Sequence, residues 1–225
     1  MSGRVLLVAG SDSDSFAQAD IKTVTALGGK PSAATSVRQA IEALLRGTGA
    51  DAVKIGMLPD EAAIDAVAEA LDATGGKIPW VVDPVMRAAG GAAALNATAS
   101  HALKAKLILH ATVLTPNVQE AEMLTGMKIA HAADLERAAN MLLTLGPKAV
   151  LLKGGQLASE TVQDLLVGDG IMEWFRGPRL GDGPSKGAGG TLASGIAAGL
   201  AQGMGLRDAV AKARDYTNKT ARPAR

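Results

Sequence analysis

Cysteine is absent from this chain of 225 residues, and aromatic side chains make up only 2% of it. The first absence excludes disulfides and thiolate metal sites. The second argues against a nucleic-acid platform, because base stacking needs several aromatic rings on adjacent strands. Lys and Arg (23) almost balance Asp and Glu (22), so the net charge gives no reason to expect nucleic acid or an acidic membrane surface as partner.

Long apolar runs are missing as well. The run at 5–9 is too short for a signal peptide or a membrane span and is typical of a buried first strand. We therefore expect a cytoplasmic protein without a membrane partner. The histidines, His101, His110 and His131, have no spaced carboxylate or serine partner, which argues against a hydrolytic triad and a zinc site.

What the chain does contain is a regular alternation of short apolar runs with longer Ala-rich segments of helical period. Its length and its 48% of hydrophobic residues fit one domain over 1–225. Strands that are apolar on both faces, alternating with helices, predict an α/β protein. Its central sheet should be mostly parallel and should lie between two layers of helices. The predicted strands are 5–9, 52–55, 80–82, 113–114, 149–152 and 162–167, and the predicted helices are 18–27, 37–46, 60–73, 100–105, 120–124, 134–145 and 191–203.

The segment 162–175 departs from this alternation. Two apolar runs, 162–167 and 171–175, flank the turn Gly168-Asp169-Gly170. An Asp-Gly pair between two strands is typical of a hairpin. We therefore predict an antiparallel hairpin at one edge of the sheet.

Polar or glycine-rich residues follow most of the predicted strands. In a sheet of this kind the ligand lies beyond the carboxyl ends of the strands, so these exits should converge on one site. Asp12 and Asp14 could instead simply cap a helix. The exits are Asp12 and Asp14, then Gly56-Met57-Leu58, Asp83-Pro84-Val85-Met86, Thr115-Pro116-Asn117, and Lys153-Gly154-Gly155.

The run from Pro184 to Leu192 is rich in glycine and opens directly into an apolar helix. The first amides of a helix have no partner within it, and glycine lets the backbone approach a ligand closely. This pattern predicts a cradle for a phosphate or a developing negative charge. The residues expected to form it are Gly187, Ala188, Gly189, Gly190 and Thr191, through their backbone amides.

Asn117 and Glu120 lie three residues apart at a helix entrance and therefore share a face. Their oxygens suit Mg²⁺, which prefers oxygen ligands and keeps several waters. The same spacing is that of a capping box, in which the two side chains only close the helix end. The two roles can coexist, and both stay open here.

Lys153 stands at a predicted strand end before two glycines. A lysine in this position can hold phosphates. It could also be an ordinary surface lysine before a turn. For Asp20 two interpretations are likewise open: it could contact a ligand, or it could be an exposed residue of a helix.

Seven blocks of this sequence, in order and over nearly the whole chain, resemble hydroxymethylpyrimidine/phosphomethylpyrimidine kinases of the ribokinase-like superfamily. A single block would be weak evidence for this resemblance, but seven blocks in the same order are strong evidence. The blocks are Ala9-Gly10-Ser11-Asp12-Ser13, Gln18-Ala19-Asp20-Ile21-Lys22-Thr23, Lys54-Ile55-Gly56-Met57-Leu58, Asp83-Pro84-Val85-Met86, Thr115-Pro116-Asn117-Val118-Gln119-Glu120-Ala121, Lys153-Gly154-Gly155 and the closing glycine run.

The resemblance implies a three-layer ribokinase-like fold and an ATP- and Mg²⁺-dependent kinase of thiamine biosynthesis. The substrate would be a hydroxymethyl or phosphomethyl pyrimidine, with a pyridoxal-type molecule as a variant of the same chemistry. By the same resemblance, Lys153, Asp83 and Thr191 would contact the nucleotide, and Asn117 and Glu120 the metal, partly through water. Substrate contacts would come from Gly10, Asp20, Val85 and Met57, with Met86 in the apolar pocket wall.

Three departures from the family pattern bear on activity. Gly190 stands where relatives carry a cysteine or aspartate, so general-base help for the substrate hydroxyl is absent from that position. The segment 30–36 leads almost at once into the predicted helix 37–46, which reduces the flap over the substrate to a turn. The first loop is bulkier than the glycine loop of relatives, at Asp14-Ser15-Phe16-Ala17.

These departures leave rival hypotheses beside the kinase. One is a protein that binds nucleotide or pyrimidine without turnover. Another is a degenerate or engineered kinase without a lid. A third is an assembly partner, in which the Ala-rich helices or an exposed sheet edge pair with a second copy as a homodimer.

Overall fold

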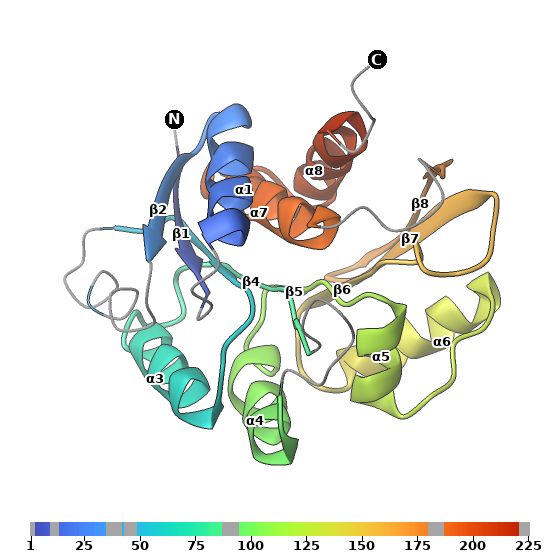
Figure 1. Ribbon diagram of the computed structural model, residues 1–225, viewed down its shortest axis with the longest axis horizontal. Helices are drawn as coiled ribbons and strands as arrows, with labels where there is room; N and C mark the ends of the chain where they lie inside the picture. Colours follow the sequence, from blue (N-terminus) through green and yellow to red (C-terminus); the bar gives the residue numbers. More distant parts are fainter. Residues whose placement is uncertain are drawn as a thin grey trace.

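The structure is a computed structural model, and it describes residues 3–9, 14–34, 42, 49–86, 95–179 and 187–220. The predicted helix 37–46 and Gly10 lie outside these ranges, apart from Glu42. Helices cover both faces of one central sheet, which gives the three layers expected from the alternation of elements (Figure 1). The α/β fold class is thereby confirmed.

The sheet has eight strands in the order β2-β1-β3-β4-β5-β6-β7-β8. Neighbours from β2 to β6 run parallel, and β7 and β8 are antiparallel to the strands beside them. The carboxyl ends of β1, β3, β4, β5 and β6 therefore meet at one edge. The bounds are β1 Arg4–Val8, β2 Lys30–Ala34, β3 Ala52–Ile55, β4 Trp80–Val82, β5 Val113–Leu114, β6 Ala149–Leu152, β7 Thr161–Gly168 and β8 Ile171–Pro178.

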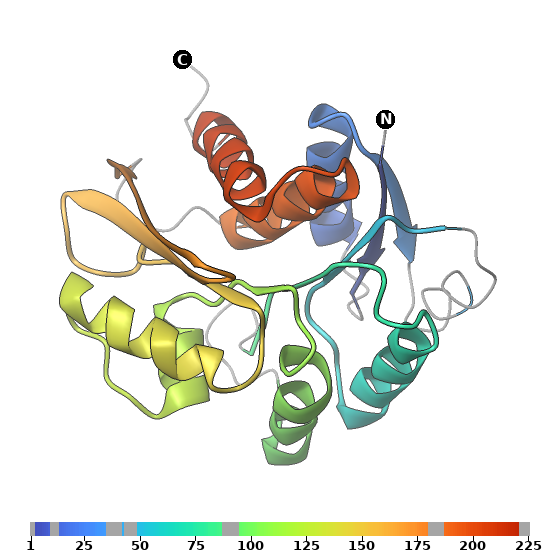
Figure 2. The same ribbon diagram turned by 180° about the vertical axis from the view of Figure 1, so that it is seen from behind.

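Alternate side chains of the strands divide the apolar core between the two faces of the sheet. Val53 and Ile55 of β3, for example, belong to one buried cluster, and Ala52 belongs to the other. Helices α1, α7 and α8 cover one face, and α3 to α6 cover the other (Figure 2). The bounds are α1 Asp14–Ala26, α3 Glu61–Asp72, α4 Ala97–Ala102, α5 Val118–Thr125, α6 Ala132–Leu143, α7 Ala188–Ala201 and α8 Leu206–Thr220, and a π-helical segment, η1, continues α4 over Leu103–Ile108.

The predicted hairpin is confirmed in β7 and β8. Asp169 and Gly170 turn the chain with φ values of 54° and 75°. Positive φ at both central residues is the requirement of a tight hairpin turn, and an Asp-Gly pair tolerates it. This hairpin forms the edge of the sheet opposite β2.

The sequence did not predict two elements of the fold, the edge strand β2 and the last helix α8. The segment after α1 forms the edge strand β2, paired with β1 from Arg4↔Lys30 onward, where only a turn was expected. Pro31 obscured it, because proline is rare in central strands but tolerated on an edge. Helix α8 was not predicted, although its buried residues Leu206, Ala209, Val210 and Ala213 have helical spacing.

Across the described part of the chain, no helix is both long enough and apolar enough to cross a membrane.

Candidate active site

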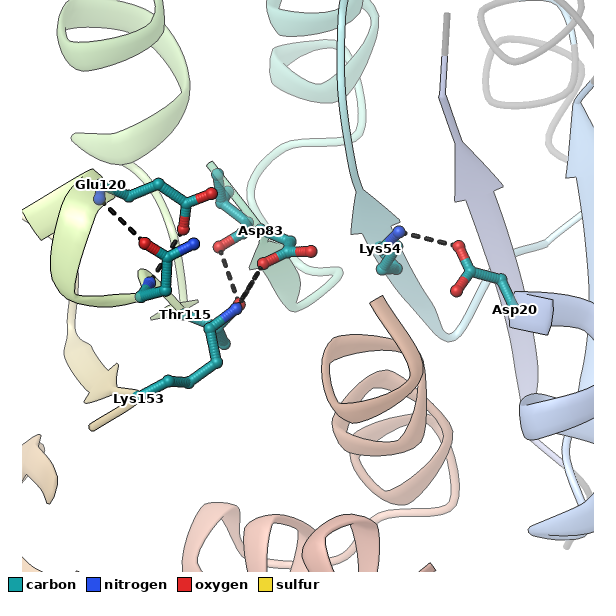
Figure 3. Close-up of polar contacts among 8 residues, drawn as sticks. Asp20, Lys54, Asp83, Thr115, Glu120 and Lys153 are labelled. Atoms are coloured by element: carbon teal, nitrogen blue, oxygen red, sulfur yellow. Dashed lines mark hydrogen bonds and ion pairs between the residues drawn. The ribbon is translucent and has the colours of Figure 1, made fainter. Parts of the chain in front are cut away.

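Two charged side chains and a hydroxyl come together beyond the carboxyl ends of β4, β5 and β6 (Figure 3). The Lys153 ammonium lies 2.9 Å from Oδ1 of Asp83, and the Thr115 hydroxyl lies 3.2 Å from the same oxygen. The Lys153 side chain is only 13% exposed and that of Asp83 only 5%. Lys153 is therefore part of a buried cluster, and the alternative of an ordinary surface lysine is wrong.

The backbone fixes Lys153 in this place. Its N–H donates to the carbonyl oxygen of Pro116 over 2.9 Å, and an isolated parallel bridge joins Lys153 to Asn117. The pairing of β5 with β6 thus continues for one step beyond the strands. It brings the polar exits of both strands side by side.

The charges in this cluster support one another. Burial disfavours the charge on Asp83, but the ammonium groups of Lys153 and Lys54 outweigh burial and hold the pKa of Asp83 below its ordinary value. Burial also disfavours the charge on Lys153, and the carboxylates of Asp83 and Glu120 nevertheless raise its pKa. Both groups are therefore charged at neutral pH.

Asn117 and Glu120 form the capping box at the start of α5. The Asn117 side chain accepts from the Glu120 N–H over 2.9 Å, and Glu120 Oε2 accepts from the Asn117 N–H over 2.8 Å. The capping interpretation is thereby confirmed. Burial first, and then the neighbouring charge of Asp83, raise the pKa of Glu120 to about 7, so this carboxylate would gain from a nearby cation.

A second buried ion pair joins α1 to β3. Lys54 Nζ lies 2.7 Å from Oδ2 of Asp20, with side chains 6% and 8% exposed. Asp20 is therefore not an exposed helix residue. Its substrate role stays a prediction, with one of its oxygens now assigned to Lys54.

Lys54 is a site residue that the sequence reasoning missed, although its motif was noted. The signal was present: a lysine inside a four-residue strand whose other members are all buried hydrophobics must find an anionic partner. Only its partner could not be read from the sequence.

The start of α7 adjoins both ion pairs. Gly187 has a left-handed backbone with φ of 82°, which glycine adopts without strain. A Cβ built on Gly189 would lie 3.0 Å from Lys153 Nζ, and one built on Gly190 would lie 3.3 Å from Asp20 Oδ1. Any side chain at these positions would crowd the two charged groups, so glycine leaves room for them beside the first helical turn.

The amides predicted to form the anion cradle divide into two groups. The Thr191 N–H donates to the carbonyl oxygen of Gly187 over 3.0 Å, as the first hydrogen bond within the helix. Its amide is therefore unavailable, and including it was wrong. Ala188, Gly189 and Gly190 precede that bond and have no partner within the helix, so their amides stay candidates.

The remaining predicted substrate residues lie at neighbouring strand exits. Met57 follows β3 and Val85 follows β4, and both side chains are half-buried. Met86 is 1% exposed and belongs to the core. Gly10, the other predicted substrate contact, lies outside the described residues.

A third buried ion pair, Asp164 with Arg214, holds the loop that follows β6. Asp164 of β7 accepts from the Gly154 N–H over 3.0 Å and from Arg214 Nε of α8 over 2.8 Å. The loop that carries Lys153 is thereby tied to the last helix. The sequence reasoning did not single out Asp164 or Arg214, because neither lies near a motif.

The donor set is compatible with Mg²⁺ held mainly through water. No cluster of three or more acidic or histidine side chains able to hold a metal occurs among the described residues. A few carboxylates with phosphate oxygens and waters are the usual surroundings of Mg²⁺. Glu120 fits such a site, because a cation would remove the cost of ionising it beside Asp83.

An edge of this kind accommodates anionic phosphoryl groups, so the fold and the site define the class of α/β proteins that bind phosphorylated ligands. The comparisons narrow this class to a family. The sequence profile of the phosphomethylpyrimidine kinase family matches residues 28–224, and the chain therefore belongs to that family.

Individual relatives agree with this assignment. A hydroxymethylpyrimidine/phosphomethylpyrimidine kinase of Streptomyces coelicolor is 39% identical over 94% of this chain and 86% of its own length. The crystal structure of a phosphomethylpyrimidine kinase from Clostridium difficile superposes with a TM-score of 0.83 at 33% identity, covering 97% of this chain and 99% of that one. A pyridoxal kinase from Staphylococcus aureus, in complex with AMP-PCP and pyridoxal, gives 0.85 at 29% identity, covering 97% and 87%. The expected ribokinase-like kinase resemblance is confirmed.

Proposed function

We propose that this chain transfers the γ-phosphoryl group of ATP to the hydroxymethyl group of hydroxymethylpyrimidine, or to the phosphate of its monophosphate, in thiamine biosynthesis. The observation that carries the proposal is the position of the Lys153 ammonium beside the first turn of α7, where a Cβ built on Gly189 would lie 3.0 Å from Nζ. A cation beside the unpaired amides of a helix N-terminus forms a site for a multiply charged anion.

Each group of the cluster has a role in this reaction. Lys153 neutralises charge on the transferring phosphoryl group, and Asp83, which also accepts from the Thr115 hydroxyl, holds its ammonium in position. The amides of Ala188, Gly189 and Gly190 stabilise the equatorial oxygens. Because phosphoryl transfer has a loose transition state, such positioning and charge stabilisation supply most of the catalysis.

Asn117 and Glu120 would hold Mg²⁺, partly through water, and Thr191 and Asp83 would complete the nucleotide site. Held by these two residues, Mg²⁺ would supply positive charge that offsets the charge of the phosphates. Glu120 keeps its place through the hydrogen bond from the Asn117 N–H. The pyrimidine would lie against Gly10, Asp20, Val85 and Met57, at the exits of β1, β3 and β4 and on α1.

The test is ADP release coupled to a chromogenic assay, with Mg²⁺ and ATP. Hydroxymethylpyrimidine, its monophosphate and pyridoxal are compared with a reaction that contains no acceptor. We expect turnover with a pyrimidine above the rate without acceptor. A higher kcat/KM with pyridoxal would overturn the pyrimidine assignment but retain the kinase.

A non-catalytic nucleotide-binding protein is the outcome to exclude. Calorimetric binding of Mg·ATP without ADP release from any of the three acceptors would establish that alternative and reject the proposed function. Lys153→Met is the matched control. It must lower both ATP binding and turnover if the activity belongs to this site.

A further inference from the structure

Gly190 has no side chain, but a carboxylate from another element of the fold lies beside it. A Cβ at this position would lie 3.3 Å from Asp20 Oδ1 and 3.9 Å from Lys54 Nζ. Asp20 comes from α1 and Lys54 from β3, so neither belongs to the glycine run. The Asp20–Lys54 pair thus lies beside the position at which the family resemblance implied a base.

The two oxygens of Asp20 differ in their surroundings. Oδ2 is bound to the Lys54 ammonium at 2.7 Å. No residue of the described chain donates a hydrogen bond to Oδ1, and this is the oxygen that faces Gly190. One oxygen is therefore anchored, and the other is directed at the start of α7.

The stability of the fold does not explain this pair. A buried ion pair is often no more stabilising than well-packed apolar side chains, because desolvation offsets the attraction. Ala52 and Lys54 project to the same face of β3, and an apolar residue at 54 would continue the core there. Gly56 adds to the case, since a Cβ on it would lie 2.9 Å from Lys54 Nζ and would crowd the ammonium.

We propose that Asp20 is the proton acceptor of this enzyme and replaces the side chain absent at Gly190, while Lys54 is the residue that positions it. This inference rests on the proposed function. Oδ1 takes the proton of the substrate hydroxyl. The hydroxyl oxygen forms a bond to the γ-phosphorus, and the bond from that phosphorus to the bridging oxygen breaks, with its electron pair leaving on ADP. The protonated carboxyl returns its proton to water when the product departs.

Asp20→Asn tests this directly. We expect kcat for the pyrimidine to fall ~10²–10⁴-fold, the usual contribution of a general base, and any rise in KM to be much smaller than this fall. The decisive companion is the double variant Asp20→Asn/Gly190→Asp. It moves the carboxylate from α1 to α7 and keeps an anion beside Lys54, and it should recover at least about tenfold of the lost kcat.

Thermal unfolding accompanies each variant, because Asp20→Asn leaves Lys54 buried without an anion. If this variant does not fold, Asp20→Asn/Lys54→Met replaces it as a neutral pair. It should fold and remain as slow as expected for the single variant. Lys22→Gln, an exposed change of charge on the same helix, should leave kcat unaltered.

Three results would overturn the assignment. They are a kcat of the folded Asp20→Asn variant within about threefold of the parent, a loss confined to KM, and a folded double variant that is no faster than the single one. The parent is assayed first. A parent that is inactive while Gly190→Asp alone is active refutes the role of Asp20 but not the kinase. Inactivity of both with every acceptor rejects the proposed function itself, and the inference with it.

Discussion

Lys153 and Asp83 lie 70 residues apart in the sequence and form a 2.9 Å ion pair at the carboxyl edge of the sheet. The pair joins the exit of β4 to the exit of β6, on either side of β5, and Thr115, the residue after β5, donates to the same carboxylate oxygen. Both charges are buried, and both are maintained by their neighbours. The packing of these strands therefore fixes both charges at this edge of the sheet.

Replacing Lys153 by methionine should lower kcat/KM for ATP by ~10²–10³-fold, since one charge that stabilises the transferring group is lost. Steady-state kinetics with varied ATP measure this. Because the change leaves Asp83 buried without its cation, Lys153→Met/Asp83→Asn serves as the folding control. This double variant should regain stability without regaining activity. A return of activity would assign Lys153 a purely structural role.

The stability of the protein should decrease with rising pH through Glu120. Its pKa of about 7 exceeds the ordinary 4.5, so the folded protein keeps a proton that the unfolded chain has lost between these values. The free energy of unfolding therefore falls as the pH rises from 4.5 to 7, by about 3 kcal/mol for a shift of this size.

Urea unfolding of the parent and of Glu120→Gln at several pH values checks this expectation. Glutamine does not titrate, and its carbonyl can still accept from the Asn117 N–H. The stability of the parent relative to this variant should decline across the interval. Two parallel stability curves would contradict it.

Asp164→Ala should destabilise the protein by about 3–5 kcal/mol, because it leaves Arg214 buried and unpaired. It also removes the acceptor of the Gly154 N–H, so KM for ATP should rise as the loop carrying Lys153 loosens. The exposed pair Arg207–Glu173 joins the same helix to the same hairpin and provides the control. Arg207→Gln should change both quantities far less. Equal effects of the two changes would refute a special role for the buried pair.

Gly199→Ala should destabilise the protein by about 1–3 kcal/mol through overpacking, although alanine favours helices. A Cβ at this position would lie 2.7 Å from the Cβ of Ala209 on α8. Ala209→Gly should restore part of the loss, and Gly177→Ala, which has no neighbour closer than 4.0 Å, should be tolerated. Thermal unfolding measures all three. A stabilised Gly199→Ala variant would show that α7 and α8 can separate at little cost.

Much of this architecture could be predicted because its signals are local. The strands at 52–55, 80–82, 113–114 and 149–152 agree with β3, β4, β5 and β6 residue for residue. The hairpin followed from Asp169-Gly170, whose backbone conformation is a local requirement. The edge strand β2 lacked such a signal. Its Lys30-Pro31 start becomes a strand only through pairing with β1.

The sequence predicted the residue types of the site and its location, but not which side chains pair with each other. The spacing of Asn117 and Glu120 allowed a cap or a metal site, and the capping bonds now seen between them belong to the helix end itself. Asp20 was noted for a substrate contact, whereas its bond to Lys54 depends on how α1 lies against β3. Asp164 and Arg214 escaped notice for the same reason.

The sequence by itself determined the order of most elements, the edge of the sheet at which polar residues gather, and the glycine-led start of α7. It could do so because hydrophobic period, turn chemistry and strand exits are set by neighbouring residues. The tertiary structure alone decided which charges meet. Lys54 and Asp20 are separated by 34 residues, and Lys153 and Asp83 by 70. Whether such groups pair depends on the packing of whole elements, since a charge can be buried only where that packing brings an opposite charge within reach.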